Sequence, residues 1–226
     1  MTPITLGIVE AYSLCPRKAF LLQRGEPAGV PHEYARVIEE QEAANRQAHR
    51  AHLVEGGEVV PFGGPAEMAA GQEIVADADL TADELHARCD FLKKVTERSR
   101  FGKFSYEPVK VIGVRRASRP DALGLAYQGL VLGEVQGRQP SSGTLALLGD
   151  RVSKVKLASK YKEVRRIVEA LRAWSSQPVD DVIHRLDPPL LVFGPYKLCF
   201  RTPASQPSSC LHHWLDRNLS TELVIL

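Results

Sequence analysis

Two carboxylates in the middle of the chain could together bind a divalent metal ion. Asp90 lies near the centre of one strand-like segment, and Glu107 lies near the start of the next. A basic turn joins the two segments, so an antiparallel pairing could place the carboxylates side by side. Mg²⁺ and Mn²⁺ prefer such hard oxygen ligands, with water or phosphate completing the shell. The spacing also allows ordinary ion pairs between Glu107 and the surrounding bases.

Other groups near this pair suggest phosphate chemistry. Lys110 could neutralise a phosphate or lower the pKa of an attacking water. His49, or His52, on a long charged helix could add a metal ligand. These residue types allow a metal site that binds phosphate, provided that the fold gathers them.

The pattern of the chain predicts an α/β domain that would position these groups. We expect helices within residues 8–25, 33–53, 119–140 and 160–178, and a loop or short hairpin over 55–72. Strands are expected at 73–80, 84–95 and 103–116, followed by a hairpin of 143–149 with 151–158. Pro108 favours an edge position, or a strand start, for the third strand.

Composition and charge narrow the class of protein. The 226 residues are 44% hydrophobic and 25% charged, which is typical of a folded globular chain. No apolar run is long enough for a membrane span, and the first residues do not resemble a signal peptide, so we expect a cytoplasmic protein without membrane partners. Residues 93–119 contain nine bases and two acids, and residues 151–172 contain eight bases and two acids. Such segments indicate either a polyanion-binding surface or a solvated one.

Four sequence motifs occur in an order that resembles RecB-like nucleases of the PD-(D/E)XK superfamily. They are "YSLCPRKAFL", the Asp of "ARCDFL", the Glu-Pro-Val-Lys of "SYEPVKV" and the helix "LGLAYQGLVLGEVQG". That superfamily includes CRISPR-associated RecB-type exonucleases, and the present motifs are most similar to an uncharacterised RecB-like branch. The resemblance implies a restriction-endonuclease-like core, namely a small mixed sheet flanked by helices, with an N-terminal helical extension.

The resemblance assigns roles to particular residues. Asp90 and Glu107 would be catalytic and hold Mg²⁺ or Mn²⁺, His49 would complete the metal shell, and Lys110 would assist the attacking water. Residues 1–178 would form the nuclease domain, and 179–226 would form a C-terminal tail that is the remnant of a cysteine-cluster region. Contacts to nucleic acid would come from these side chains: Tyr127, Gln128, Lys93, Lys94, Arg115 and Arg116.

Two features depart from the family pattern. The family has Glu-x-Lys where this chain has Glu107-Pro108-Val109-Lys110, which in a regular strand places Lys110 on the opposite face from Glu107. A bulge near Pro108, or a substitute base at Lys93 or Lys94, would restore the site; otherwise the site is inactive.

The second departure concerns a 4Fe–4S cluster that several RecB-type nucleases hold with four cysteines. Here Cys15 matches the first of them, while the tail supplies only Cys199 and Cys210. The cluster is either lost or completed by His212 or His213.

The leading functional hypothesis is therefore a Mg/Mn-dependent DNA nuclease. The alternatives are a catalytically inactive nucleic-acid-binding module with the same fold, and a fragment of a longer nuclease–helicase protein. The expected partner is DNA, single- or double-stranded, with a helicase or a CRISPR or repair protein as a further partner.

Overall fold

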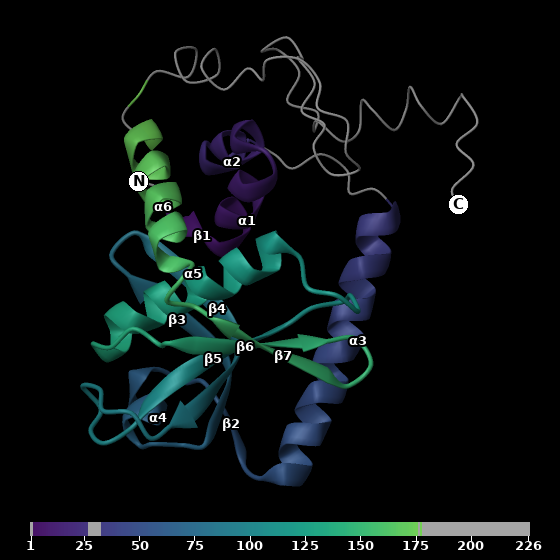
Figure 1. Cartoon of the computed structure of the whole chain (residues 1–226), viewed down its shortest axis with the longest axis vertical. Helices are drawn as coiled ribbons and strands as arrows, with labels where there is room; N and C mark the ends of the chain where they lie inside the picture. Colours follow the sequence, from purple (N-terminus) through teal and green to yellow (C-terminus); the bar gives the residue numbers. More distant parts are fainter. Residues whose placement is uncertain (1, 27–32, 176, 178–226) are drawn as a thin grey trace.

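The computed structural model describes residues 2–26, 33–175 and 177, which form helices and one mixed sheet (Figure 1). The elements follow one another as β1 (Ile4–Thr5), α1 (Leu6–Leu14), α2 (Pro16–Gln23), α3 (Glu33–Gly56), β2 (Val59–Pro61), α4 (Pro65–Ala69), β3 (Ile74–Ala82), β4 (Leu85–Val95), β5 (Ser105–Val111), α5 (Arg119–Gln136), β6 (Ser142–Leu147), β7 (Arg151–Lys156) and α6 (Tyr161–Ser175). The predicted α/β class is confirmed.

The seven-stranded sheet is open and has the order β2-β3-β4-β5-β6-β7, with β1 pairing beside β4. Strands β3, β4 and β5 form an antiparallel meander. Helix α5 then crosses over so that β6 lies parallel to β5. The β6–β7 hairpin turns through the three residues Leu148, Gly149 and Asp150, and the last two have positive φ angles of 82° and 57°.

The two faces of the sheet are covered differently. Helix α5 packs on one face within the main hydrophobic core, and α1, α2 and α6 gather at the same end of the molecule (Figure 1). Helix α3 runs along the other face over a smaller core that includes Phe91, Val109 and Ala146. Gly113 allows α3 to approach closely, because a Cβ there would lie 2.5 Å from the Ile38 carbonyl oxygen.

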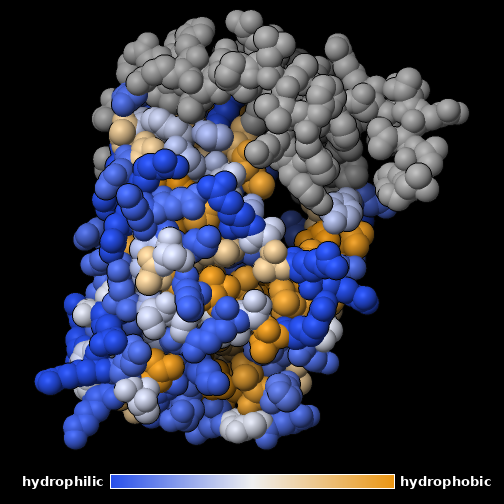
Figure 2. All heavy atoms as spheres, viewed as in Figure 1, coloured by the Kyte–Doolittle hydropathy of each residue, from blue (hydrophilic) through white to orange (hydrophobic). Residues whose placement is uncertain are grey.

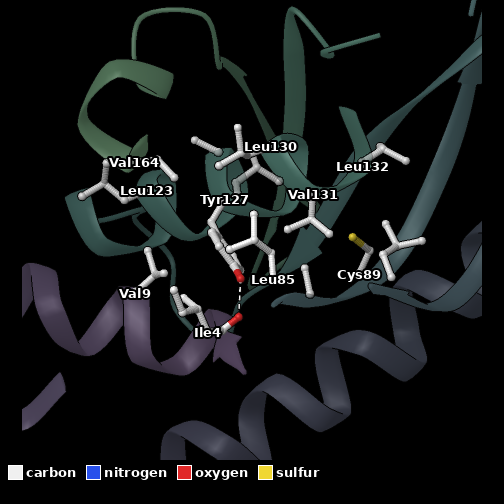
Figure 3. Packing of buried hydrophobic residues seen from close by; sticks show 14 of the residues in the cluster. Ile4, Val9, Leu85, Cys89, Leu123, Tyr127, Leu130, Val131, Leu132 and Val164 are labelled. Carbon is white, nitrogen blue, oxygen red and sulfur yellow. Dashed lines mark hydrogen bonds between the residues drawn. The ribbon is translucent and has the colours of Figure 1, made fainter. Parts of the chain in front are cut away.

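The sequence of α5 explains its central position. Ser118 caps its N-terminus in a capping box with Asp121, and Gly137 ends it with a φ of 69°. Nearly all the intervening side chains are buried, so this helix is apolar around its whole circumference. Tyr127 lies in the middle of this core and donates a hydrogen bond to the Ile4 carbonyl of β1 (Figure 3).

Two expectations about local structure need correction. The segment 55–72 was expected to be a loop or hairpin, but it contains β2, which pairs in parallel with β3, and the short helix α4. Pro108 favoured either an edge position or a strand start for β5, yet β5 lies between β4 and β6 and Pro108 is the fourth residue of Ser105–Val111. Pro108 is opposite Leu92 and next to Gly143, where a Cβ would come within 3.0 Å of the Pro108 carbonyl oxygen. The same Cβ would lie 3.2 Å from the Leu125 side chain of α5, so the absence of a side chain at Gly143 allows β5, β6 and α5 to pack closely.

Hydrophilic residues cover most of the face seen in Figure 2, with hydrophobic residues gathered in its middle and near α3. Within the described parts of the chain, none of the helices combines the length and apolar character that a membrane span requires.

Candidate functional site

Asp90 lies where β4 and β5 separate. The regular pairing of the two strands extends to Phe91 opposite Val109. At Asp90, the residue of β4 next to this last pair, the carboxylate accepts a hydrogen bond of 2.7 Å from the Val111 backbone N–H. Its other oxygen accepts one of 2.6 Å from Nε of Arg46 on α3. With 8% of its surface exposed, Asp90 therefore has both oxygens engaged by the protein itself.

Lys110 follows on β5 but points to the other face of the sheet. Its backbone partner in β6 is Leu145, a residue of the α5-side core. There its Nζ forms an ion pair with Glu10 of α1. Burial disfavours the charge, but Glu10, with smaller contributions from Asp121 and Glu42, raises the pKa of Lys110 above its ordinary value. Lys110 is thus a protonated, buried cation.

Helix α3 supplies the remaining charges. Glu42, Asn45 and Arg46 lie one helical turn apart, facing the sheet. The Asn45 side chain donates to the carbonyls of Ile112 at 2.9 Å and Ala146 at 3.3 Å, which fixes the helix to the ends of β5 and β6. Arg46 pairs with Glu42 at 2.9 Å as well as with Asp90. Burial raises the pKa of Glu42, and Arg46 partly opposes this shift.

We call this group of five residues the charged junction: Glu10, Glu42, Arg46, Asp90 and Lys110. It joins α1, α3, β4 and β5. Sequence reasoning identified Asp90 and Lys110 but missed Glu10, Glu42 and Arg46. The available signal was the polar stripe Glu42, Asn45, Arg46 and His49, whose spacing places all four on one side of a helix.

His49 lies on α3 one turn beyond Arg46, and its ring meets the edge of Phe91 with centroids 5.5 Å apart. Burial lowers the pKa of His49, His52 lowers it further, and the nearby Asp90 and Asp150 oppose this. His49 therefore lies within the electrostatic influence of Asp90, while its role as a metal ligand stays a prediction.

Glu107 lies away from the charged junction. It is four residues before Val111, whose N–H binds Asp90, and four residues of extended strand span about 13 Å. The carboxylate accepts a hydrogen bond from the Ser142 hydroxyl and lies 3.8 Å from Nζ of Lys154. The structure therefore does not bring Asp90 and Glu107 to one site.

The register of β4 and β5 also decides the position of Lys110. Pairing continues without interruption from Val95–Ser105 to Phe91–Val109, so no bulge occurs at Pro108. Glu107 and Lys110 consequently face opposite sides of the sheet. Of the two substitute bases, Lys93 lies directly opposite Glu107, whereas Lys94 pairs with Glu73 at 2.8 Å.

These positions test whether the residues fit the expected divalent metal. A Mg²⁺ or Mn²⁺ ion needs several oxygen ligands within about 2.0–2.6 Å. Asp90 is engaged by Arg46 and Val111, and Glu107 is too far along β5 to share an ion with it. Among the described residues, no group of three acidic, histidine or cysteine side chains is placed to hold a metal. The residues in this arrangement do not fit the metal.

The residues expected to contact nucleic acid divide into two sets. Tyr127 and Gln128 are buried in the core, where Gln128 donates to the Arg88 carbonyl at 2.7 Å. Neither side chain reaches the surface in this structure. Arg115 and Arg116 are exposed after β5, and Lys93 is exposed on β4.

The structure describes two of the four cysteines, Cys15 and Cys89. Cys15 is buried where α1 ends and α2 begins, with the following Pro16 in the first turn of α2. Cys199 and Cys210 lie outside the described residues, so their role as cluster ligands stays a prediction. Cys89 is buried in the core, where burial raises the pKa of its thiol.

Comparison of the chain with models of known protein families and with curated proteins finds no match.

Proposed function

We propose that this chain is a nucleic-acid-binding module with a restriction-endonuclease-like core whose catalytic centre is inactive. The mixed sheet, with its β5–α5–β6 crossover between helices on both faces, supports the assignment of the core. One observation carries the proposal of inactivity. The carboxylate expected to hold the metal, Asp90, is neutralised by Arg46, and its expected partner Glu107 lies elsewhere on β5.

The chemistry of the charged junction explains why this arrangement would not hydrolyse a phosphodiester. Arg46 occupies the carboxylate that a divalent cation would need, and Lys110 is held by Glu10 on the opposite side of β5. Moving Arg46 away would leave Asp90 buried without its cationic partner, which is costly. The junction therefore serves to join helices to the sheet.

Exposed basic residues support the binding part of the proposal. They occur at both ends of β5, with Lys93 and Lys103 near one end and Arg115 and Arg116 beyond the other. Cations on a folded surface bind the phosphate backbone regardless of sequence, with strong dependence on salt.

The experiment compares binding and cleavage of labelled DNA and RNA by the wild-type protein in Mg²⁺ and in Mn²⁺. We expect salt-sensitive binding and intact nucleic acid after prolonged incubation. The variants Asp90→Asn and Glu107→Gln keep a hydrogen-bond acceptor at each position. We expect Asp90→Asn to bind as the wild type does, and Glu107→Gln, which removes a negative charge 3.8 Å from Lys154, to bind at least as tightly.

Two results would overturn the proposal. Cleavage by the wild type that both substitutions abolish would establish the metal-dependent nuclease instead. Absence of binding to any labelled nucleic acid at low salt would reject the binding module.

A further inference from the structure

Among the described residues, helix α3 leaves part of its face of the sheet uncovered. It crosses that face from the end of β5, where Asn45 binds the Ile112 carbonyl, to β2, where Leu53 packs. The opposite ends of β4, β5, β6 and β7 lie beyond it. There the register aligns one row of residues across four strands, in the order Lys93, Glu107, Ser142 and Lys156.

A second row adds another lysine. Lys154 lies opposite Thr144 on β6, two residues before Lys156 and on the same side of β7. We call Lys93, Lys154 and Lys156 the open lysine face. All three are exposed, and the side chain of Lys154 is 70% exposed. Ala146, the next residue of β6 on this side, belongs to the core under α3, so the lysines are on the α3 side of the sheet.

The acid at the centre of this face is shielded. The Glu107 side chain is only 12% exposed and is bound by the Ser142 hydroxyl. It lies 3.8 Å from Lys154. The described part of the chain supplies no ion-pair partner for Lys93 or Lys156. The lysines thus present net positive charge to solvent, in contrast to the neutralised charged junction.

The basic groups continue along the edge of the sheet. Strand β7 is the last strand of the sheet, and its first residue, Arg151, donates to the Arg115 carbonyl at 2.9 Å. Arg115 and Arg116 are exposed at that end. Six residues of strand span about 20 Å, with Lys154 and Lys156 about 7 Å apart. Cations therefore follow β7 from one end to the other.

We propose that the phosphate backbone of a nucleic acid lies along β7 on the open lysine face. This inference rests on the proposed function and names its binding surface. Point charges spaced along an exposed strand suit a chain of phosphates, which they contact without reading bases. The outward face of α6, with Lys162 and Arg166, is the competing basic surface, and it lies on the α5 side of the sheet.

The test measures binding of short labelled single strands and duplexes by fluorescence anisotropy over a range of salt concentrations. The double variant Lys154→Gln, Lys156→Gln removes two phosphate contacts. We expect weaker binding at every salt concentration. The slope of log K against log salt should shrink by about 1.4 for single strands and about 1.8 for duplexes.

The matched control is the double variant Lys162→Gln, Arg166→Gln, which also removes two exposed cations. We expect its slope to equal that of the wild type. Both variants should unfold within about 0.5 kcal/mol of the wild type, as exposed substitutions do, and circular dichroism melting checks this.

The outcomes separate this inference from the proposed function. If the wild type binds nucleic acid and the β7 variant keeps its slope, the surface is wrong while the function stands. If only the α6 variant shows a smaller slope of log K against log salt, the phosphate backbone of the nucleic acid lies along α6 instead. If poly-glutamate displaces the oligonucleotide at equal charge concentration, the face binds acidic protein segments. If the wild type binds no nucleic acid, the proposed function itself fails.

Discussion

The charged junction and the open lysine face use the same residue types in opposite ways. In the charged junction, Lys110 pairs with Glu10 and Arg46 pairs with Asp90, in each case between two elements. These ion pairs neutralise both cations within the protein. On the open lysine face, the ion-pair partner of Lys154 among the described residues is the mostly buried Glu107, at 3.8 Å. Satisfied charges join elements together, whereas unsatisfied exposed charges remain available to a partner.

The cost of burial explains this difference. A charged group taken out of water must find hydrogen bonds and a counter-charge, or the fold loses stability. Asp90 finds both in Arg46 and Val111. The exposed lysines carry no such requirement, so their removal affects binding more than folding.

Replacement of Asp90 by alanine is expected to have the largest effect on stability. It leaves the Val111 N–H and the Arg46 guanidinium without their acceptor, at a cost of about 3 kcal/mol. Urea unfolding measures this loss.

A double-mutant cycle with Arg46→Gln is the control for this prediction. The combined variant should lose less than the sum of the two single losses, because the pair is removed as a unit. Additive losses, or a loss under about 1 kcal/mol for Asp90→Ala, would show that the junction does not depend on this pair.

Gly113→Ala is expected to have a smaller effect on the same region. Its Cβ would lie 2.5 Å from the Ile38 carbonyl oxygen and 2.8 Å from the Glu42 nitrogen, both backbone atoms of α3. Helix α3 must shift outward, at a cost of about 2 kcal/mol by thermal unfolding.

Gly7→Ala in α1 is the matched control, because no atom lies within 4 Å of a Cβ there. It should be neutral or stabilising by up to about 1 kcal/mol, since alanine favours helix over glycine. Equal melting temperatures for the two variants would contradict the close approach of α3.

The smallest expected effect is a pH dependence that originates at His49. Its pKa in the folded protein is lowered from 6.5, first by burial and then by His52. The folded state therefore binds fewer protons than the unfolded state at this site. Its contribution to stability is present above pH 6.5 and is lost as the pH falls through the folded pKa.

The slope from one proton cannot exceed about 1.4 kcal/mol per pH unit. His49→Gln should flatten the curve of stability against pH below 6.5. His52→Gln, at an exposed position on the same helix, should retain most of the wild-type pH dependence. An unchanged curve in His49→Gln would assign the dependence to other groups.

Much of the fold could be predicted because its signals are local. Periodicity and capping residues indicated α5 and α6, and Gly149-Asp150 indicated the hairpin. The central position of β5 could not be predicted, because it depends on pairing with β4 and β6, which Pro108 in its own sequence disfavours. The strand β2 was missed because its hydrogen-bond partners lie in β3 and its own sequence, Val59–Pro61, is only three residues long between glycine-rich stretches.

The candidate site was less predictable because it depends on register. The sequence shows Asp90 and Glu107 on consecutive strands, but only the pairing of Lys93 with Glu107 reveals that the carboxylates lie apart. A shift of a few residues in the pairing of β4 with β5 would have brought the two carboxylates together. Likewise, Glu10 reaches Lys110 only through the packing of α1, a contact between distant parts of the chain.

The pairing of β1 with β4 has a consequence for the order of folding. Ile4 donates to the Glu84 carbonyl and accepts from Tyr127 of α5, so β1 has no place to bind until the meander and α5 have formed. Contacts so distant along the chain form late, because closing a long loop costs entropy before any contact repays it. Helices α1 and α2 follow β1 in sequence and dock with it. We therefore expect Glu10 to reach Lys110 only late in folding, when the first segment of the chain packs on the sheet.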